Sequence, residues 1–396
     1  MSKVWLDSDI QLEMHLLQVT NTYFPELQFG GPPQKIHALS QGLAQRGHHV
    51  RVVSFDSQHP RASDERTVDG VTVQYLPWVG RGLRQCPTDW TLLDALVRET
   101  EIVHLYGLYN LLCPLAARLA RKHTRPFVLE PLGMYPPRAR NVLAKRIYNR
   151  CLTRGMARRC AALIAASAGE LEDIRPLASN RRVVLRRNGI DVTAFQNLPS
   201  RMEFRNRHGL AASDGVVLFL GRISPIKNLE QLIIAFHQAA LPGANLFLVG
   251  PAEEPNYRNR LEKLIQEHRL VDRVRFSGPA FGRDKLAALA GADLLVLPSV
   301  NESYGNAAAE AVASGIPVLV TETCGIAPIM HERAGLAVPP GVESLAKGLI
   351  AMMDGVQREE LTARRAEVLR ELSWDEPLKE TEALYAEIGT AGGPFL

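Results

Sequence analysis

Short apolar runs alternate with helical stretches along almost the whole chain, and this alternation constrains the fold more than any other feature of the sequence. The runs are rich in Val, Ile and Leu, which is typical of parallel strands that are buried between helices. Strands that alternate with helices predict a parallel sheet with helices on both faces. We therefore expect an α/β protein, built from two Rossmann-like units that follow one another along the chain.

The expected elements can be placed from the hydrophobic pattern. In the first unit, strands are expected near 14–20, 50–55, 71–76, 102–106, 127–131, 162–167 and 183–187, and helices near 33–46, 89–99, 111–122, 140–160 and 168–175. In the second unit, strands are expected near 216–220, 245–249, 274–277, 293–297 and 317–321, and helices near 228–240, 256–268, 283–290, 306–313 and 342–353. The polar stretch 197–213, which contains a proline and several charges, is predicted to link the units.

Length and composition agree with this organisation. The chain has 396 residues, of which 46% are hydrophobic, so each half can bury a core of its own. We expect a first domain over 1–200 and a second over 201–374. The five cysteines lack CxxC spacing and are predicted to be free thiols. No apolar run approaches the length of a membrane span and no signal-type segment begins the chain, so a cytoplasmic protein is expected.

The segment Leu297–Val318, LPSVNESYGNAAAEAVASGIPV, places two glutamates around a turn of small residues. Glu302 is expected in a loop that follows a strand, and Glu310 on the second turn of the next helix, with Asn306 as the N-cap. In open α/β sheets, ligands collect outside the carboxyl ends of the strands, near helix N-termini. Carboxylates at that edge can accept hydrogen bonds from the vicinal hydroxyls of a sugar or a ribose. The alternative is a pair of ordinary solvated glutamates.

A second segment, GRISPIKN at 221–228, follows another apolar run. Gly221 ends the expected strand, Arg222 follows directly, and Lys227 precedes the next helix. The planar fork of an arginine can grip phosphate oxygens in pairs, and a lysine adds a mobile positive charge. The two cations therefore suit a diphosphate, although two surface cations are the alternative from these residues alone.

In this order and separation, the two segments resemble the family 4 retaining glycosyltransferases. The E-x7-E motif of that family corresponds to Glu302 and Glu310, and its G-R-x-x-x-x-K-N motif to 221–228. Weaker similarities extend over nearly the whole chain, in FGGPPQKI at 29–36, EIVHLYGLYN at 101–110 and LSWDEPLKETEALYAEI from Leu372. The resemblance implies the GT-B fold, with donor mainly on the second domain, acceptor mainly on the first, and a C-terminal helix within 375–396 that returns to the first domain.

The resemblance also implies roles for the site residues. Arg222 and Lys227 would stabilise the leaving diphosphate, Glu302 would hold a hydroxyl of the donor sugar near the reacting centre, and Glu310 would hold the ribose. Further contacts to the donor are expected from Gly30, Gly31, Gly221, Pro251, Ser303, Tyr304, Gly305 and Asn306. The adjacent glycines at 30–31 suit the close approach of backbone N–H groups to an anion. With these cations on the diphosphate, we expect no metal ion and no cofactor besides the donor substrate.

One position departs from the family pattern. Many relatives carry a histidine at the end of a first-domain strand, where this chain has Leu132 in EPLG at 130–133. The usual contact to the donor sugar is lost there, and the surroundings of the sugar are left open. His104, in the neighbouring IVHLYG segment, is a candidate catalytic residue that could take its place. The alternative is that His104 is a packed histidine of the core.

The charge of the chain is unevenly distributed, although the net charge is only +4. Between 138 and 159 the sequence carries eight Arg and Lys residues and no acidic residue, interleaved with Val, Leu, Ile and Met. A helix of this composition could lie on an anionic membrane surface, or it could be an ordinary solvated helix. No nucleic-acid-binding motif accompanies the charge, so nucleic acid is not an expected partner.

The most favoured function is a retaining glycosyltransferase of the hexosyltransferase class. It would move a sugar from a nucleotide-diphosphate sugar, UDP or GDP, to a glycan or lipid-linked glycan in cell-envelope or exopolysaccharide synthesis. Two alternatives keep the fold but change the activity. One is a nucleotide-sugar epimerase or a phosphorolytic enzyme, and the other is a nucleotide-sugar-binding member without transferase activity. Donor-dependent release of the nucleotide would separate the transferase from the binding protein.

Overall fold

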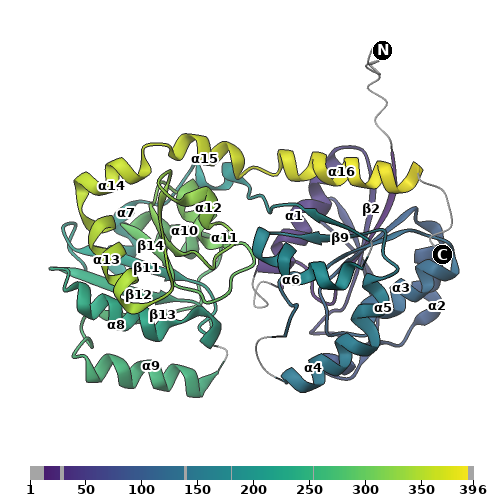
Figure 1. The fold of residues 1–396 in the computed structure, drawn as a ribbon, viewed down its shortest axis with the longest axis horizontal. Helices are drawn as coiled ribbons and strands as arrows, with labels where there is room; N and C mark the ends of the chain where they lie inside the picture. The colour runs from purple at the N-terminus through teal and green to yellow at the C-terminus, as the bar shows by residue number, and fades with distance from the viewer. Residues whose placement is uncertain (1–12, 27–30, 138–140, 180, 253, 391–396) are drawn as a thin grey trace, which may run out of the picture.

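The computed structural model describes residues 13–26, 31–137, 141–179, 181–252 and 254–390. Two parallel sheets form two lobes, which Figure 1 shows side by side. The predicted fold class is confirmed, because each sheet is covered by helices on both faces in the manner of a Rossmann-like domain.

The first sheet has eight strands in the order β10-β9-β8-β7-β1-β2-β4-β3. They are β1 (His15–Val19), β2 (His49–Ser54), β3 (Asp64–Val68), β4 (Val71–Tyr75), β7 (Ile102–Tyr106), β8 (Phe127–Glu130), β9 (Ala162–Ala165) and β10 (Arg182–Leu185). Only β3 runs antiparallel to its neighbour among these strands. The short strands β5 (Trp78–Val79) and β6 (Cys86–Pro87) form a separate antiparallel pair.

The helices of this domain are α1 (Gly31–Gln45), α2 (Trp90–Glu99), α3 (Leu112–Lys122), α4 (Val142–Tyr148), α5 (Arg154–Ala157) and α6 (Ala168–Ala178), with a 3-10 turn at Gly82–Arg84. A second 3-10 turn, Val192–Phe195, packs against the core of the second domain. The single helix predicted over 140–160 is interrupted, because a π-helical segment, Asn149–Thr153, separates α4 from α5. The strands β3, β5 and β6 were not predicted, since they are short or carry mostly exposed polar residues.

The second sheet has the strand order β13-β12-β11-β14-β15-β16. Its strands are β11 (Gly215–Leu220), β12 (Ala244–Val249), β13 (Val274–Gly278), β14 (Leu294–Leu297), β15 (Val318–Thr321) and β16 (Gly335–Val338). Its helices are α7 (Arg201–Arg207), α8 (Leu229–Ala239), α9 (Pro255–Glu267), α10 (Gly282–Gly291), α11 (Asn306–Ala313), α12 (Ala327–Met330), α13 (Val342–Met353), α14 (Gly355–Thr362) and α15 (Arg365–Glu371), with a 3-10 turn at Pro225–Lys227. The chain reverses direction across the sheet between β11 and β14, and such a switch point opens a crevice for ligands.

The stretch predicted as the linker belongs to the second domain instead. It contains α7, whose Phe204 is buried in the second core together with the preceding Ile190 and Phe195. The many charges of this stretch suggested a solvated linker, but Arg205 of α7 is itself fully buried, where it donates to the backbone oxygen of Gly291 and pairs with Asp293.

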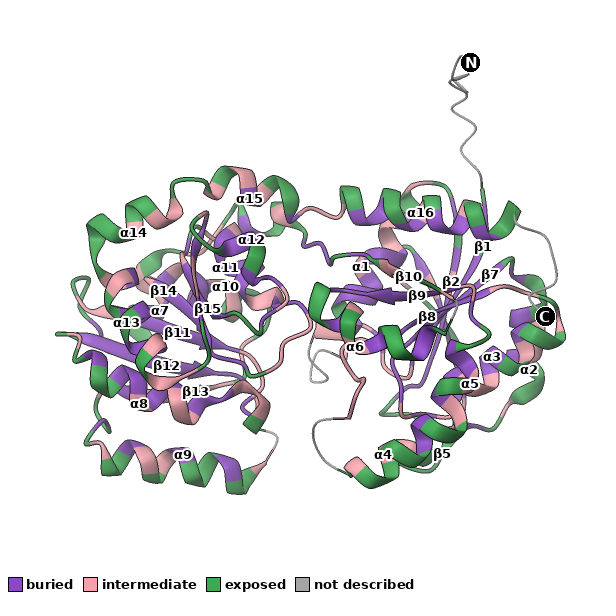
Figure 2. Cartoon of the chain, in the orientation of Figure 1, coloured by how far each residue is buried: buried purple, intermediate pink, exposed green. Residues whose placement is uncertain are grey.

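The last helix, α16 (Asp375–Thr390), returns to the first domain, as the resemblance implied. Its residues Leu378, Leu384, Tyr385 and Ile388 are buried in the same cluster as strands of the first sheet. Figure 2 shows the general pattern, with buried strands inside both lobes and exposed residues on the outer faces of the helices. The domain boundaries at 200 and 374 remain predictions.

Candidate active site

A cavity of about 230 Å³ lies between the two domains, at the carboxyl ends of β1, β8, β11 and β14. Nine of the predicted site residues line it: Gly31, Gly221, Arg222, Lys227, Glu302, Ser303, Tyr304, Gly305 and Asn306. Residues that are far apart in the sequence therefore meet where the strand order predicts a ligand crevice.

The loop after β14 turns sharply into α11 at Gly305. Its φ of 117° is a conformation that side chains rarely adopt, and a Cβ there would lie 2.9 Å from Cγ2 of Ile326. Gly305 occupies the N-cap position and Asn306 is the first residue of the helix, so the prediction that Asn306 caps the helix was wrong by one residue. Asn306 and Ala307, the first two residues of α11, therefore line the cavity.

Lys227 and Glu302 form an ion pair across the second-domain wall of the cavity. Both side chains are largely buried, at 14% and 19% exposure. A carboxylate has several acceptor positions and an ammonium has three donors, so each group keeps capacity for a ligand while it holds the other in place. Arg222 lines the same wall and is half-buried.

Glu310 lies one turn further along α11 and does not line the cavity. Its Oε1 accepts a hydrogen bond of 2.9 Å from Nζ of Lys285 on α10. Lys285 was not predicted, because no pattern in the sequence connects it with the glutamate. Among the described residues, no hydrogen bond reaches the other carboxylate oxygen of Glu310.

The first-domain wall contains three residues that sequence reasoning did not assign to it: Lys35, Asn188 and Ala166. The amide nitrogen of Asn188 donates to Oδ1 of Asn306 at 3.4 Å, which connects the two domains. Its own Oδ1 is buried and has no partner among the described residues. The sequence contained a signal for the burial of Lys35. It precedes Leu39 by four residues and Leu43 by eight, so all three share the buried face of α1.

Lys35 belongs to a buried group of charges at the end of β8. Its ammonium pairs with Oε1 of Glu130, and Nη2 of Arg186 lies 2.6 Å from Oε2 of the same carboxylate. Burial opposes ionisation of Glu130, but the charges of Arg186 and Lys35 outweigh it and hold the pKa of Glu130 below its ordinary value. The carboxylate therefore keeps its charge and orients both cations.

His104 lies in the packed interior of the first domain and does not line the cavity. It is 1% exposed, its ring stacks on Tyr106, and its Nδ1 is 2.6 Å from the hydroxyl of Tyr385 on α16. Burial lowers the pKa of His104 to about 4, so the ring is neutral near pH 7. The structure thus favours the alternative of a packed core histidine over a catalytic one.

One other predicted contact also differs from expectation. Pro251 does not line the cavity, and its carbonyl oxygen accepts the backbone N–H of Ile223 at 2.8 Å. Gly30 lies outside the described residues. Leu132 does line the cavity, and its apolar side chain offers no hydrogen bond to a sugar there.

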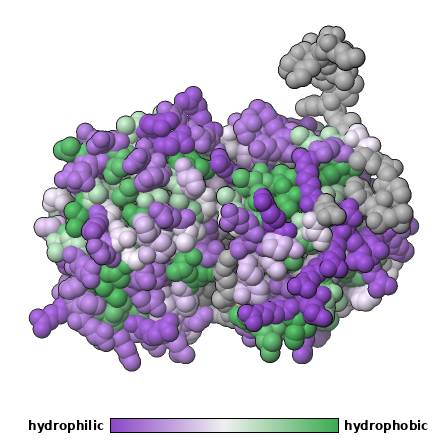
Figure 3. All heavy atoms as spheres, viewed as in Figure 1, coloured by the Kyte–Doolittle hydropathy of each residue, from purple (hydrophilic) through white to green (hydrophobic). Residues whose placement is uncertain are grey.

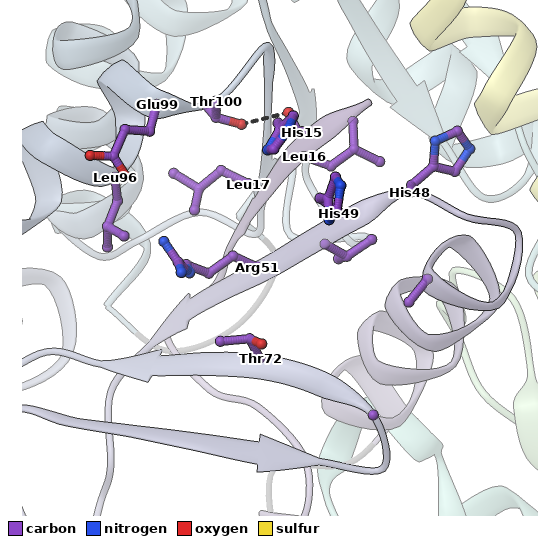
Figure 4. Close-up of a pocket in the computed structure, with 13 residues that line it drawn as sticks. His15, Leu16, Leu17, His48, His49, Arg51, Thr72, Leu96, Glu99 and Thr100 are labelled. Carbon is purple, nitrogen blue, oxygen red and sulfur yellow. Dashed lines mark hydrogen bonds between the residues drawn. The ribbon is translucent and has the colours of Figure 1, made fainter. Parts of the chain in front are cut away.

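A larger hollow, of about 680 Å³, lies at the opposite edge of the first sheet. Figure 4 shows His15, His49 and Arg51 around it, with Thr100 hydrogen-bonded to the backbone of His15. These residues stand at the starts of strands, whereas ligands of such sheets bind at the strand ends, so we place the active site in the smaller cavity.

No group of three or more His, Cys, Asp or Glu side chains among the described residues could hold a metal ion. In the same part of the chain, no helix is both long enough and apolar enough to cross a membrane.

Comparison with known proteins agrees with the fold. The sequence matches the models of the "Glycosyl transferase 4-like domain" over 30–189 and of "Glycosyl transferases group 1" over 200–367. The D-inositol 3-phosphate glycosyltransferase of Mycobacteroides abscessus is 31% identical, over 75% of this chain and 71% of that protein. The chain belongs to the family 4 glycosyltransferases.

Other similar proteins differ in what they act on. The GDP-mannose:cellobiosyl-diphosphopolyprenol alpha-mannosyltransferase of Xanthomonas oryzae is 27% identical to this glycosyltransferase, over 77% of this chain and 78% of that protein. Among solved structures, Anabaena Alr3699/HepE in complex with UDP-glucose superposes with a TM-score of 0.75 at 20% identity, and covers 96% of this chain and 100% of its own. The structural likeness supports the GT-B fold of this glycosyltransferase.

Proposed function

We propose that this glycosyltransferase transfers a hexose-type sugar from a nucleotide-diphosphate sugar with retention of anomeric configuration. The observation that carries the proposal is the position of Arg222 and Lys227 in one interdomain cavity with Glu302, while Glu310 stands one helical turn beyond it. Two cations suit the diphosphate, and the carboxylates suit hydroxyls of the sugar and of the ribose on either side.

The chemistry follows from the charge that develops when the anomeric bond breaks. Negative charge accumulates on the departing phosphate, so Arg222, Lys227 and the first N–H groups of α11 would stabilise the transition state. Preorganised donors of this kind contribute roughly 3–4 kcal/mol each. Because the cations meet the charge of the diphosphate, we also propose that turnover does not need a metal ion.

The acceptor hydroxyl would attack from the face on which the phosphate departs. In that geometry the leaving phosphate can receive the acceptor proton, and no protein nucleophile is required. The names of the similar proteins support a nucleotide sugar as donor, with UDP-glucose in the Anabaena structure and GDP-mannose in the Xanthomonas enzyme. They also support inositol phosphate or a lipid-linked glycan as models for the class of acceptor.

We further propose that the basic stretch docks on an anionic membrane at the cytoplasmic face. Leu143 and Ile147 share one face of α4 and are 73% and 57% exposed, beside Arg146 and Arg150. Figure 3 shows hydrophobic surface next to strongly hydrophilic surface over this helix. Exposed apolar side chains flanked by cations are the pattern of an interfacial helix, and such docking would suit a lipid-linked acceptor in envelope or exopolysaccharide synthesis.

The test of the transferase proposal is a screen of UDP-, GDP- and ADP-sugars for nucleotide release, with NMR of the product anomer. Release of one nucleotide and an unchanged anomeric configuration would support the proposal. Binding without release would support a binding protein, and conversion of the donor sugar without an acceptor would support an epimerase. Full loss of activity in EDTA, restored by magnesium, would contradict metal-independent turnover.

Membrane docking is tested separately with vesicles. The wild type should sediment with vesicles that contain phosphatidylglycerol and not with phosphatidylcholine alone, and L143S/I147S should sediment less. Equal sedimentation of wild type and variant with both kinds of vesicle would reject this part of the proposal.

A further inference from the structure

The two walls of the cavity differ in how they carry positive charge. The second domain contributes Arg222 and Lys227, both on loops that follow strands. Among the described residues of the first domain, Lys35 is the charged side chain that lines the cavity. Leu132, on the same wall, offers no polar group. Any first-domain contact to a charged ligand here must therefore involve Lys35, the side-chain amide of Asn188 or backbone N–H groups.

Lys35 is held at this wall by a partner that does not use all of its hydrogen-bond donors. Its side chain is 4% exposed, and its ammonium pairs with Glu130, which is its only hydrogen-bond partner among the described residues. An ammonium has three N–H donors. Two donors of a buried lysine beside the cavity are therefore available to a ligand.

Two cationic side chains of this buried group share one carboxylate, and burial lowers the pKa of Lys35 while the charge of Glu130 opposes that shift. Glu130 faces two cations, Lys35 and Arg186, and Nε and Nη1 of Arg186 have no partner among the described residues. His104 is close by but neutral near pH 7, because its pKa is lowered to about 4. Unbalanced buried charge is unfavourable, and an anion in the cavity would offset it.

One further carboxyl group faces Lys35 from α6. Glu170 accepts backbone N–H groups from Gly133 at 2.5 Å and from Ala166 at 2.9 Å. Burial raises the pKa of Glu170, which favours its neutral form. Glu170 is thus engaged with the backbone, and no hydrogen bond of the described residues joins it to Lys35.

We propose that Lys35 is a catalytic residue that contacts the donor phosphate next to the transferred sugar, from the wall opposite Arg222 and Lys227. This inference rests on the proposed function. The bond between the anomeric carbon and the phosphate oxygen breaks with its electron pair on that oxygen, the acceptor oxygen bonds to the anomeric carbon, and the acceptor proton passes to the departing phosphate. Lys35 stays protonated, and its free N–H donors meet the growing charge, while Glu130 acts as a positioning residue.

The position of Lys35 on the first domain has a kinetic consequence. The domains approach closely here, since a Cβ on Gly133 would lie 2.8 Å from Cβ of Ser303 and one on Gly31 would lie 3.0 Å from the Asn306 amide nitrogen. A contact made across this junction forms only when the domains are together. Loss of Lys35 should therefore reduce kcat much more than the affinity for the nucleotide, which the second domain binds.

The experiment compares K35M with wild type, because methionine keeps the length of the chain and removes its charge. We expect kcat to fall on the order of 10²–10³-fold. KM for the donor and the Kd for the free nucleoside diphosphate should change less than about threefold, and K35R should restore part of kcat. Lys122 on α3 is an exposed lysine outside the site, and K122M is the matched control that should behave like wild type.

A purely structural role of Lys35 would give a different result. K35M would then lose thermal stability, while the kcat of the folded protein would stay within about threefold of wild type, and this outcome overturns the proposal. If K35M does not fold, K35Q retains an amide donor for Glu130 and must show the same loss of kcat. Measuring R222M in parallel separates the proposed role of Lys35 from the proposed diphosphate site. Unchanged kcat in K35M alone rejects Lys35, whereas unchanged kcat in R222M as well rejects the proposed diphosphate site.

Discussion

The two walls of the cavity differ in how far apart in the sequence their residues lie. On the second-domain wall, Arg222, Lys227, Glu302 and Asn306 come from two short segments that directly follow strands. On the first-domain wall, Gly31, Lys35, Leu132 and Asn188 come from three separate parts of the chain, and the charge of Lys35 depends on partners further away. A wall made of local segments can be recognised in a sequence, whereas a wall made by long-range packing has to be seen in the structure.

The largest effect should come from the buried charges behind the first-domain wall. In E130Q, Lys35 and Arg186 lose the carboxylate that both contact, and the variant should lose roughly 3–5 kcal/mol of unfolding free energy in urea denaturation. E382Q is the matched control, since Glu382 pairs with Arg46 and His48 at a partly exposed site and should cost about 1 kcal/mol or less. If both variants lose the same stability, the first-domain wall does not depend on buried charge.

A nearly equal effect, but on activity, is expected from the second-domain wall. R222A should lower kcat/KM by about 3–4 kcal/mol, or on the order of 10²–10³-fold, because it removes a donor from the leaving phosphate. Its melting temperature should stay close to that of wild type. R260A changes an exposed arginine on α9 and should leave turnover unaltered in the same nucleotide-release assay. Activity in R222A equal to that in R260A would contradict the assignment.

The pH dependence of stability tests whether His104 belongs to the core behind the first-domain wall. Its pKa is about 4 when folded and near 6.5 when unfolded, so the unfolded state binds the extra proton between these values. Its contribution is complete above pH 6.5, is lost as the pH falls toward 4, and amounts to roughly 3 kcal/mol. In H104Q, denaturation curves from pH 7 to 4 should show a shallower fall, and an unchanged slope would contradict a neutral buried His104.

The smallest effect should come from substitution of Lys285, which tests how Glu310 is held next to the second-domain wall. K285M removes the hydrogen bond that orients Glu310, and we expect about 1–2 kcal/mol weaker binding of the nucleoside diphosphate, with little change in kcat. K347M, in an exposed ion pair on α13, is the matched control for calorimetry. Tighter nucleotide binding in K285M would mean that Lys285 competes with the ribose for Glu310.

Much of the fold could be predicted because the strands of both sheets are buried on both faces. The apolar runs that become β11, β12, β14 and β15 were placed within a residue or two, and so were most of the helices between them. Prediction failed where the local pattern was weak, as in the exposed strand β3, or where tertiary packing decided, as in α7 with its single buried phenylalanine.

The candidate site shows the same division. Arg222, Lys227, Glu302 and Asn306 were predicted and do meet in one cavity, because the loops at the carboxyl ends of adjacent strands converge. His104 was a candidate for the site, but the hydroxyl of Tyr385, from a helix at the far end of the chain, completes a packed core around it. No spacing between residues 104 and 385 could reveal that contact.

The sequence by itself determined the class of fold and the residues of the second-domain wall, because hydrophobic periodicity and loop positions are local properties of the chain. The tertiary structure decided which side chains complete the first-domain wall, how Glu130 divides its two oxygens between Lys35 and Arg186, and why Glu310 is held by Lys285. Those outcomes depend on the burial of charges brought together from distant segments, and the energy of a buried charge is set by its surroundings in space rather than by its neighbours in sequence.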